Sequence, residues 1–374
     1  MKKIFIISAA LLAVVLIFLG IYNFAFKKSA QIAQQPVVEP VKVAVAPAKA
    51  EKIKVISDGG VIGPVFDKKT QELKYYDVLT GLVWKMDAEG KGKQQVTNTK
   101  VANLKSVLWS PEQSKVLTTT QKDGQTSFYM YDYQSQKGTL LKNGLDTAVW
   151  DNLGVKIFYK YFNAASKERT LNIANPDGSG WQKIVDITVR KLSMAPVPLT
   201  SLVSFWNFPN KDEETQLQIA GMVGGEPKTI LKGRFGADYL WSPDGAVALV
   251  SSLRNKDSNA ITLGLVTIEG VYSDLNIPTL VSKCAWSVDG KTVYYTLPGG
   301  IPDGTKMPNE YQEGKFNTDD TFWKINITTG EKERIIEASD IAGKYDASGL
   351  FLSPTEDALY FINKVDKKLY RIQL

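Results

Sequence analysis

Five charged residues recur at a comparable place in the chain. Each lies three or four positions before an apolar residue near the end of a β-rich run, and the five are Lys105, Asp146, Arg190, Asp238 and Lys283. If those apolar residues are structurally equivalent, the charges form a ring of mixed sign, which would bind a polar or charged ligand. The alternative is that they are ordinary solvated charges at the starts of strands.

Two of these residues are carboxylates and suggest a second chemistry. Asp146 and Asp238 would lie on opposite sides of the ring, and a pair of carboxylates can serve as acid and base on a glycan without any histidine. That chemistry requires the two carboxyl groups to be roughly 5 to 9.5 Å apart. A carboxylate-dependent glycan hydrolase or lyase is therefore the alternative to a binding function.

Loops supply the remaining candidate binding residues, Trp206, Arg254 and Tyr311. Tyr311 lies within a long insertion between Pro298 and Asp320, which is rich in Gly, Pro, Asn and acidic residues. A loop of this length without secondary structure of its own is often a lid or a binding element, so we expect a mobile loop. The alternative is that the insertion is a surface loop without a function and that Asp320 only caps a strand.

Composition narrows the function further. The chain contains no histidine and one cysteine, Cys284, so it lacks His-based triads and imidazole metal ligands. We expect neither a metal nor a cofactor, and the sequence favours a binding protein without excluding an enzyme. The net charge is +6, but residues 1–28 carry four lysines and no acid, which leaves about +2 on the rest of the chain and argues against nucleic-acid binding.

An internal repeat defines the elements that must position these residues. The phrase Trp241-Ser242-Pro243-Asp244-Gly245 returns in altered copies, and its first residue aligns with other large apolar residues at steps of 41 to 47 residues and a final step of 66. A period of this length with β-rich units predicts an all-β propeller. The aligned positions predict seven blades, or six if the weakest copy is not one: Phe66, Trp109, Trp150, Met194, Trp241, Trp286 and Leu352.

Strand counting predicts how the ring closes. The last unit supplies only three strand-like runs, whereas residues 52–57 form another run before the first unit. We expect the N-terminal run to complete the last blade, because closure removes an exposed sheet edge. In propellers, ligands usually meet the face that carries the loops between the fourth and first strands and between the second and third.

The repeats Trp241 to Gly245 and Trp286 to Lys291 resemble the WD40-like repeat of TolB-type propellers, which is also found in propeller domains of prolyl oligopeptidases. The resemblance covers residues 53–374. It implies a protein-binding or ligand-binding platform in the cell envelope. Neither the helical N-terminal domain of TolB nor the hydrolase domain of the peptidases has a counterpart here.

The N-terminus predicts an anchor. Ile4 to Tyr22 is an apolar run flanked by lysines, long enough to cross a bilayer, so residues 1–28 are predicted to be an uncleaved transmembrane helix. Residues 29–52 contain three prolines and predict an extended linker to the propeller at 53–374. The leading hypothesis is a membrane-anchored scaffold outside the cytoplasm, periplasmic or at the cell surface, that binds an envelope protein or peptide.

Overall fold

The computed structural model of the protein describes residues 12–22 and 52–374. The chain divides into two units, residues 1–50 and 51–374. In the first unit, residues 12–22 are helical, and no helix in the described parts of the chain has the length and hydropathy of a membrane span. Most of the predicted anchor (1–28) and of the predicted linker (29–52) lies outside the described residues.

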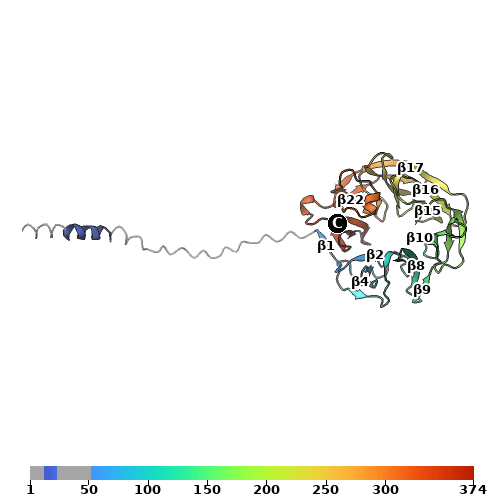
Figure 1. Ribbon diagram of the computed structural model, residues 1–374, viewed down its shortest axis with the longest axis horizontal. Coiled ribbons are helices and arrows are strands. Elements are labelled where there is room, and N and C mark those ends of the chain that lie inside the picture. The colour runs from blue at the N-terminus through green and yellow to red at the C-terminus, as the bar shows by residue number, and fades with distance from the viewer. Residues whose placement is uncertain (1–11, 23–51) are drawn as a thin grey trace, which may run out of the picture. The chain divides into compact units, whose positions relative to one another are not determined.

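The second unit is an all-β propeller, whose sheets stand in a ring (Figure 1). Each sheet is named here by its first and last strands. The β2–β5 sheet comprises β2 (Val61–Phe66), β3 (Leu73–Asp77), β4 (Val83–Met86) and β5 (Gln94–Gln95). The β6–β9 sheet comprises β6 (Leu104–Trp109), β7 (Lys115–Lys122), β8 (Gln125–Asp132) and β9 (Lys137–Leu140). The β10–β13 sheet comprises β10 (Leu145–Trp150), β11 (Ile157–Phe162), β12 (Arg169–Ala174) and β13 (Gln182–Asp186).

A seven-stranded sheet follows, because the long strand β17 pairs with β16 through its first half and with β18 through its second half. This β14–β20 sheet comprises β14 (Leu192–Pro196), β15 (Leu202–Asn207), β16 (Glu214–Gly221), β17 (Lys228–Trp241), β18 (Val247–Leu253), β19 (Ile261–Thr267) and β20 (Tyr272–Ile277). The β21–β24 sheet comprises β21 (Cys284–Trp286), β22 (Thr292–Gly299), β23 (Asp319–Asn326) and β24 (Lys332–Arg334).

The last sheet closes the ring as the strand count predicted. Strand β1 (Ile53–Val55) pairs antiparallel with β27 (Leu369–Gln373), which continues to β26 (Ala358–Asn363) and β25 (Ala347–Leu352). Ile53 lies opposite Ile372, and both side chains are buried in one core cluster. The two ends of the folded unit therefore lie in one sheet, with the C-terminus next to β1 (Figure 1).

Three of the repeated tryptophans link their sheets to the one before. Six of the seven aligned positions end the first strand of a repeat; Met194 instead lies two residues before the end of β14. The indole nitrogens of Trp109, Trp150 and Trp286 donate hydrogen bonds to main-chain carbonyls of the preceding repeat, at Gly63, Leu108 and Leu240. The aromatic therefore both packs between sheets and satisfies a polar group of its neighbour.

The turn that follows is fixed by its own side chains. Ser242 Oγ donates to Asp244 at 2.5 Å, and it also accepts the Val247 amide. Gly245 has a φ of +70°, and a Cβ there would lie 2.3 Å from the Pro198 carbonyl oxygen. The turn thus needs glycine both for its backbone conformation and for the close approach of the neighbouring turn.

Candidate functional site

The insertion between β22 and β23, residues 300–318, is an ordered element docked on the propeller. It contains the short helix α2 (Asn309–Gln312). Asn309 accepts the Lys211 amide at 2.8 Å and donates to Asn210 Oδ1 at 2.9 Å, both in the loop between β15 and β16. The expectation of a loop without secondary structure is therefore wrong, because specific polar contacts and a buried tyrosine hold this segment.

That tyrosine, Tyr311, is 4% exposed and joins the insertion to the last sheet. Its hydroxyl donates to Asp346 Oδ1 at 2.6 Å, and the Lys364 ammonium lies 3.4 Å from the centroid of its ring. Burial is the largest cause that raises the pKa of Tyr311, so the phenol stays protonated and remains a donor. Tyr311 therefore anchors the insertion to the sheet that closes the ring.

Lys283 is the centre of a buried ionic cluster beneath Tyr311. Its ammonium lies 2.6 Å from Asp320 and 2.8 Å from Asp346, and all three side chains have no exposed surface. Although burial alone would raise the pKa of Asp346, the charge and hydrogen bonds of Lys283, together with the Tyr311 hydroxyl, hold it below its usual value. Lys283 is therefore not an accessible charge at the channel mouth, and Asp320 is a buried ion-pair partner and not merely a strand cap.

A cavity of about 600 Å³ lies between the insertion and the β14–β20 sheet. Arg190, Lys191 and Phe208 form one side, and Glu313 and Gln312 of the insertion form another. Phe208 is 43% exposed, with the Lys191 ammonium 5.9 Å from its ring centroid. We call this the insertion cavity, and the side-chain amides on its walls come from Asn207, Asn210, Asn309 and Gln312.

A second cavity, of about 420 Å³, adjoins it because Arg190 lines both. We call it the Asp146 cavity; Asp146, Phe162 and Arg169 are also on its walls. The side chain of Asp146 is 41% exposed and accepts a 2.5 Å hydrogen bond from the fully buried Lys160. Burial outweighs that pairing and raises the pKa of Asp146.

The other residues that the sequence singled out line neither of these cavities, although Trp206 lies on the wall of a third cavity, of about 560 Å³, that shares Asn207 and Glu213 with the insertion cavity. Trp206 is buried, and its indole nitrogen donates to Asp238 at 3.0 Å. Burial raises the pKa of Asp238, which lines neither cavity. Lys105 is exposed at a bulge in β6, and exposed Arg254 donates to Asn276 at 3.3 Å. The structure thus places Arg190 and Asp146 together and gives Trp206, Lys283 and Tyr311 structural contacts.

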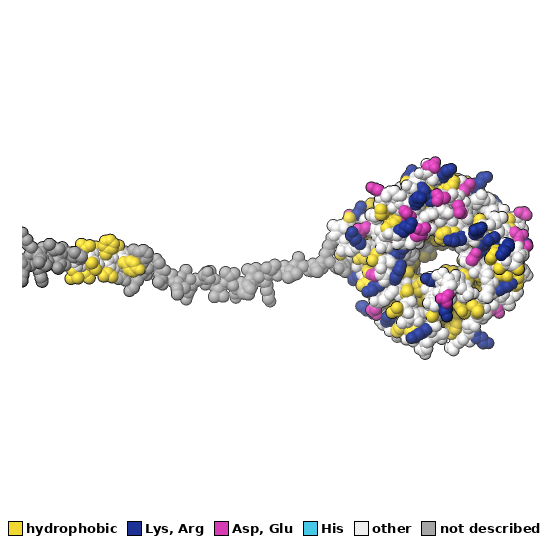
Figure 2. Space-filling view, in the orientation of Figure 1, with side chains coloured by type: hydrophobic (Ala, Val, Ile, Leu, Met, Phe, Trp, Pro, Cys, Tyr) yellow, Lys and Arg dark blue, Asp and Glu magenta, His cyan; other side chains and the backbone are white. Residues whose placement is uncertain are grey.

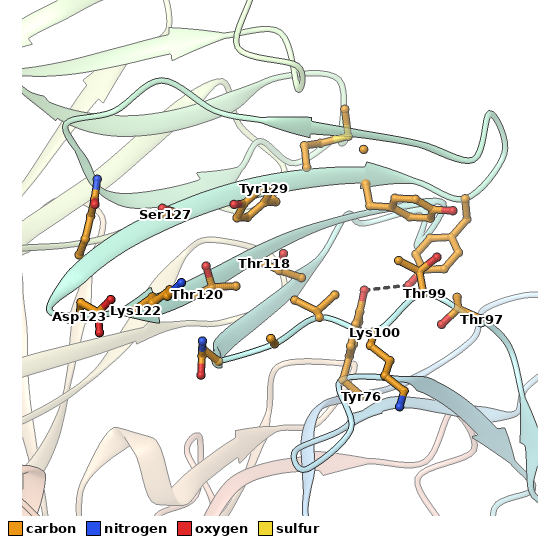
Figure 3. Close-up of a pocket in the computed structure, with 18 residues that line it drawn as sticks. Tyr76, Thr97, Thr99, Lys100, Thr118, Thr120, Lys122, Asp123, Ser127 and Tyr129 are labelled. Atoms are coloured by element: carbon orange, nitrogen blue, oxygen red, sulfur yellow. Dashed lines mark hydrogen bonds between the residues drawn. The ribbon is translucent and has the colours of Figure 1, made fainter.

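Sequence reasoning did not identify the cavity shown in Figure 3, which has a volume of about 730 Å³. It lies on one face of β7 and β8, opposite residues 97–103, and its walls carry Thr118, Thr120, Ser127 and Tyr129. The alternation of Tyr129, Tyr131 and Tyr133 with other residues was a possible sequence indication. We call this cavity the tyrosine groove.

An opening passes through the centre of the ring, with Lys and Arg side chains on its rim (Figure 2). Within residues 12–22 and 52–374, no group of three or more Asp, Glu and Cys side chains lies close enough to hold a metal ion. The described residues therefore provide open cavities and paired charges as the features available for ligand binding.

Known structures agree with this architecture, although no protein-family model and no curated protein sequence matches the chain. An oligogalacturonate lyase from Vibrio parahaemolyticus is similar, with a TM-score of 0.62 at 13% identity, covering 86% of this chain and 93% of that one. The β-propeller domain of the Trilobed protease from Pyrococcus furiosus gives a TM-score of 0.54 at 12% identity, covering 84% and 92%.

The fold is a β-propeller. The matches also include TolB from Acinetobacter baumannii, with a TM-score of 0.46 at 12% identity, covering 86% of this chain and 65% of that one. The propeller expected from the repeats is thus confirmed as a fold by neighbours with higher TM-scores, among them the Trilobed protease domain. At these identities the likeness shows nothing about the ligand.

Proposed function

We propose that this protein is a membrane-anchored propeller outside the cytoplasm that binds a segment of a partner protein in the insertion and Asp146 cavities. The observation that carries the proposal is that Arg190 lines both cavities, so the two lie next to each other and a segment could contact both. Sites for ligands are usually concave and combine apolar surface with a few converging polar groups. This site has such a composition.

The walls suit a peptide segment in particular. The Gln312 amide on the wall of the insertion cavity can both donate and accept hydrogen bonds, as a peptide backbone requires, whereas the amides of Asn207, Asn210 and Asn309 already bond to protein groups. Phe208 offers an exposed aromatic surface for an apolar side chain. Arg190 and Glu313 provide both signs of charge, so the site would distinguish partners by the order of charges along the segment.

The proposal includes a ring of seven blades. Dividing the seven-stranded sheet within β17, where Phe235 pairs with both Glu214 and Leu253, leaves two four-stranded blades that share one long strand. Together with the five four-stranded sheets, this division gives seven. It also includes the membrane helix at 1–28 and the linker at 29–52, which would present the propeller to an envelope partner.

Affinity capture with matched variants tests the binding site. The full-length chain, solubilised in detergent, is used to capture a partner from envelope extract, and the partner is then identified and purified. We expect Arg190→Ala combined with Phe208→Ala to weaken its binding at least tenfold, whereas Trp181→Ala, a similarly exposed aromatic outside both cavities, leaves it unchanged. The absence of a reproducible partner, or equal binding by the double variant, would count against the proposal.

The anchor needs a separate test. We expect the full-length protein to remain with membranes after alkaline carbonate washing and to be degraded by protease added outside the cytoplasmic membrane. Release by the wash, or protection from the protease until that membrane is lysed, would contradict the anchored, extracytoplasmic placement. The result does not depend on which cavity binds the partner.

A glycan hydrolase or lyase is the second candidate, because Asp146 lies at a cavity beside Arg190 and burial raises the pKa of its carboxyl, as a proton-donating group requires, although Asp238 does not line that cavity. Two of the structural neighbours are described as oligogalacturonate lyases. Incubation with oligogalacturonate, followed by ultraviolet absorbance of unsaturated products and by reducing-end assay, tests this candidate. Turnover by the wild type that is lost in both Asp146→Asn and Asp238→Asn would favour it over the binding role.

A further inference from the structure

The tyrosine groove arises from a mismatch in strand length between two neighbouring sheets. Strands β7 and β8 each have eight residues, whereas β4 has four and β5 only two. The part of the β7–β8 face around Val116 packs against Tyr76 of the β2–β5 sheet. The part of the face around Thr118 and Thr120 has no strand of the described part of the chain opposite it. Residues 97–103 form the other wall of the groove there (Figure 3).

The floor of the groove is a sheet face, so a ligand meets side chains there. Thr118 lies opposite Tyr129, and Thr120 lies opposite Ser127, in the register of β7 and β8. Opposed residues point to the same face, so these four side chains form one surface. The backbone N–H and C=O groups of these strands lie in the plane of the sheet and do not point toward the groove. A peptide in the groove therefore could not bind by adding a strand to β7 or β8.

The hydroxyl groups on this surface are available to a ligand. Within residues 52–374, no protein group hydrogen-bonds the side-chain hydroxyls of Thr118, Thr120, Ser127 or Tyr129, and Thr118 is only 4% exposed. A hydroxyl both donates and accepts, so a row of them is best satisfied by ligand hydroxyls with the same dual capacity.

Four tyrosines line the groove, and Tyr129 is the one that lies opposite Thr118 on the floor. Tyr129 is 40% exposed and lies beside the hydroxyl row, where its ring offers a flat apolar platform (Figure 3). Charged groups at the groove are few and of mixed sign, namely Lys100, Lys122 and Asp123, so ionic attraction selects neither an acidic nor a basic ligand. The C–H face of a sugar can pack on the Tyr129 ring while the sugar hydroxyls bond to the row of hydroxyl side chains beside it.

We propose that the tyrosine groove binds a short, uncharged oligosaccharide, with one sugar ring stacked on Tyr129 and its hydroxyls bonded by Thr118, Thr120 and Ser127. The volume of about 730 Å³ falls within the usual range for small-molecule sites of about 300 to 1,000 Å³. The inference is independent of the proposed protein partner, whose site lies around Arg190. A protein with both sites would join a glycan and a protein partner on one scaffold.

Isothermal titration tests this inference with the full-length chain in a detergent that contains no sugar. The probes are cello-, malto- and chito-oligosaccharides, with oligogalacturonate and a lysine-rich peptide as charged comparisons. We expect at least one neutral series to bind, Tyr129→Ala to weaken that binding about tenfold or more, and Thr120→Val to weaken it by about twofold to tenfold through loss of one hydrogen bond. Tyr129→Phe, which keeps the ring, should stay within about threefold of the wild type.

Two matched controls separate this site from general effects. Trp181→Ala removes an aromatic of similar exposure, 44%, outside the groove, and Arg190→Ala alters the proposed partner site; both should bind the sugar as the wild type does. Binding of none of the neutral sugars, or equal binding by Tyr129→Ala, overturns the inference. Selective binding of either charged probe also overturns it, while leaving the proposed protein partner untouched.

Discussion

The Tyr311 hydroxyl lies 2.6 Å from Asp346 Oδ1, so a residue of the insertion donates a hydrogen bond to the residue that precedes strand β25. Asp346 in turn lies 2.8 Å from the Lys283 ammonium. One buried chain of contacts therefore connects the insertion, the β21–β24 sheet and the sheet that closes the ring. The insertion wall of the proposed binding site depends on that chain.

Replacing Lys283 by methionine should destabilise the fold strongly. It leaves Asp320 and Asp346 buried without their cation, and loss of one partner from a buried ion pair costs about 3 to 5 kcal/mol. Denaturant unfolding followed by tryptophan fluorescence measures the change. Lys324→Met removes only the exposed pair with Glu333 and should cost about 1 kcal/mol or less, so equal effects of the two variants would contradict a structural role for Lys283.

Tyr311→Phe should loosen the insertion while the ring stays folded. The variant loses a hydrogen bond to a carboxylate, which is worth about 1.5 to 3 kcal/mol. Hydrogen exchange measured by mass spectrometry should show faster exchange in residues 300–318 than in the wild type. Tyr129→Phe, whose hydroxyl has no protein partner in residues 52–374, is the control; unchanged exchange in Tyr311→Phe would show that other contacts hold the insertion.

Ring closure can be tested at two adjacent residues of β1. The Ile56 amide donates to Leu369, so by alternation the Lys54 amide also faces β27 and the Val55 amide faces outward. Lys54→Pro should therefore cost about 3 kcal/mol or more in stability, whereas Val55→Pro at the outer edge should cost much less. If the two proline variants unfold at the same denaturant concentration, β1 does not close the ring in the way described.

Asp238→Asn should stabilise the protein at neutral pH. Burial raises the pKa of Asp238 in the folded state above the unfolded value of about 3.9. The folded state therefore holds the proton more tightly than the unfolded state. Stability falls as the pH rises from the unfolded-state pKa to the folded-state pKa. Asparagine keeps an oxygen to accept the Trp206 indole hydrogen without the buried charge. Unfolding measured from about pH 4 to 7 should show an advantage that grows with pH.

The control for that series is Asp186→Asn, whose side chain is 71% exposed and should change stability by no more than about 0.5 kcal/mol at any pH. An Asp238→Asn variant that is less stable than the wild type at neutral pH would contradict this account, because it would mean that the ionised carboxylate of Asp238 stabilises the fold.

The propeller could be predicted because the residues that determine it lie close together in the sequence and recur along the chain. The indole nitrogens that bond the preceding repeat require a tryptophan at a fixed place in three of the units, and this contributes to the period that the sequence shows. Closure by β1 followed from counting strands in the last unit. Met194 shows the limit of the pattern, since its strand runs two residues farther than the alignment placed it.

The site was less predictable because it depends on contacts between distant residues. Lys283 precedes a strand, where a charge is usually solvated, yet its partners lie 37 and 63 residues farther along the chain. The tyrosine groove depends on β5 having only two residues in a different sheet, which no pattern within 118–133 reveals. Of the candidate residues, Arg190 and Asp146 lie together at cavities, and their role in binding stays a prediction.

Site-specific photo-crosslinking is the most direct test of the proposed binding site. A photoreactive amino acid is placed at Phe208, which lines the insertion cavity, and in a second strain at Trp181, which does not. The account predicts one discrete crosslinked protein from position 208, lost when Arg190→Ala is added, and none from position 181. Crosslinks to the same protein from both positions, or from neither while the protein remains folded, would contradict it.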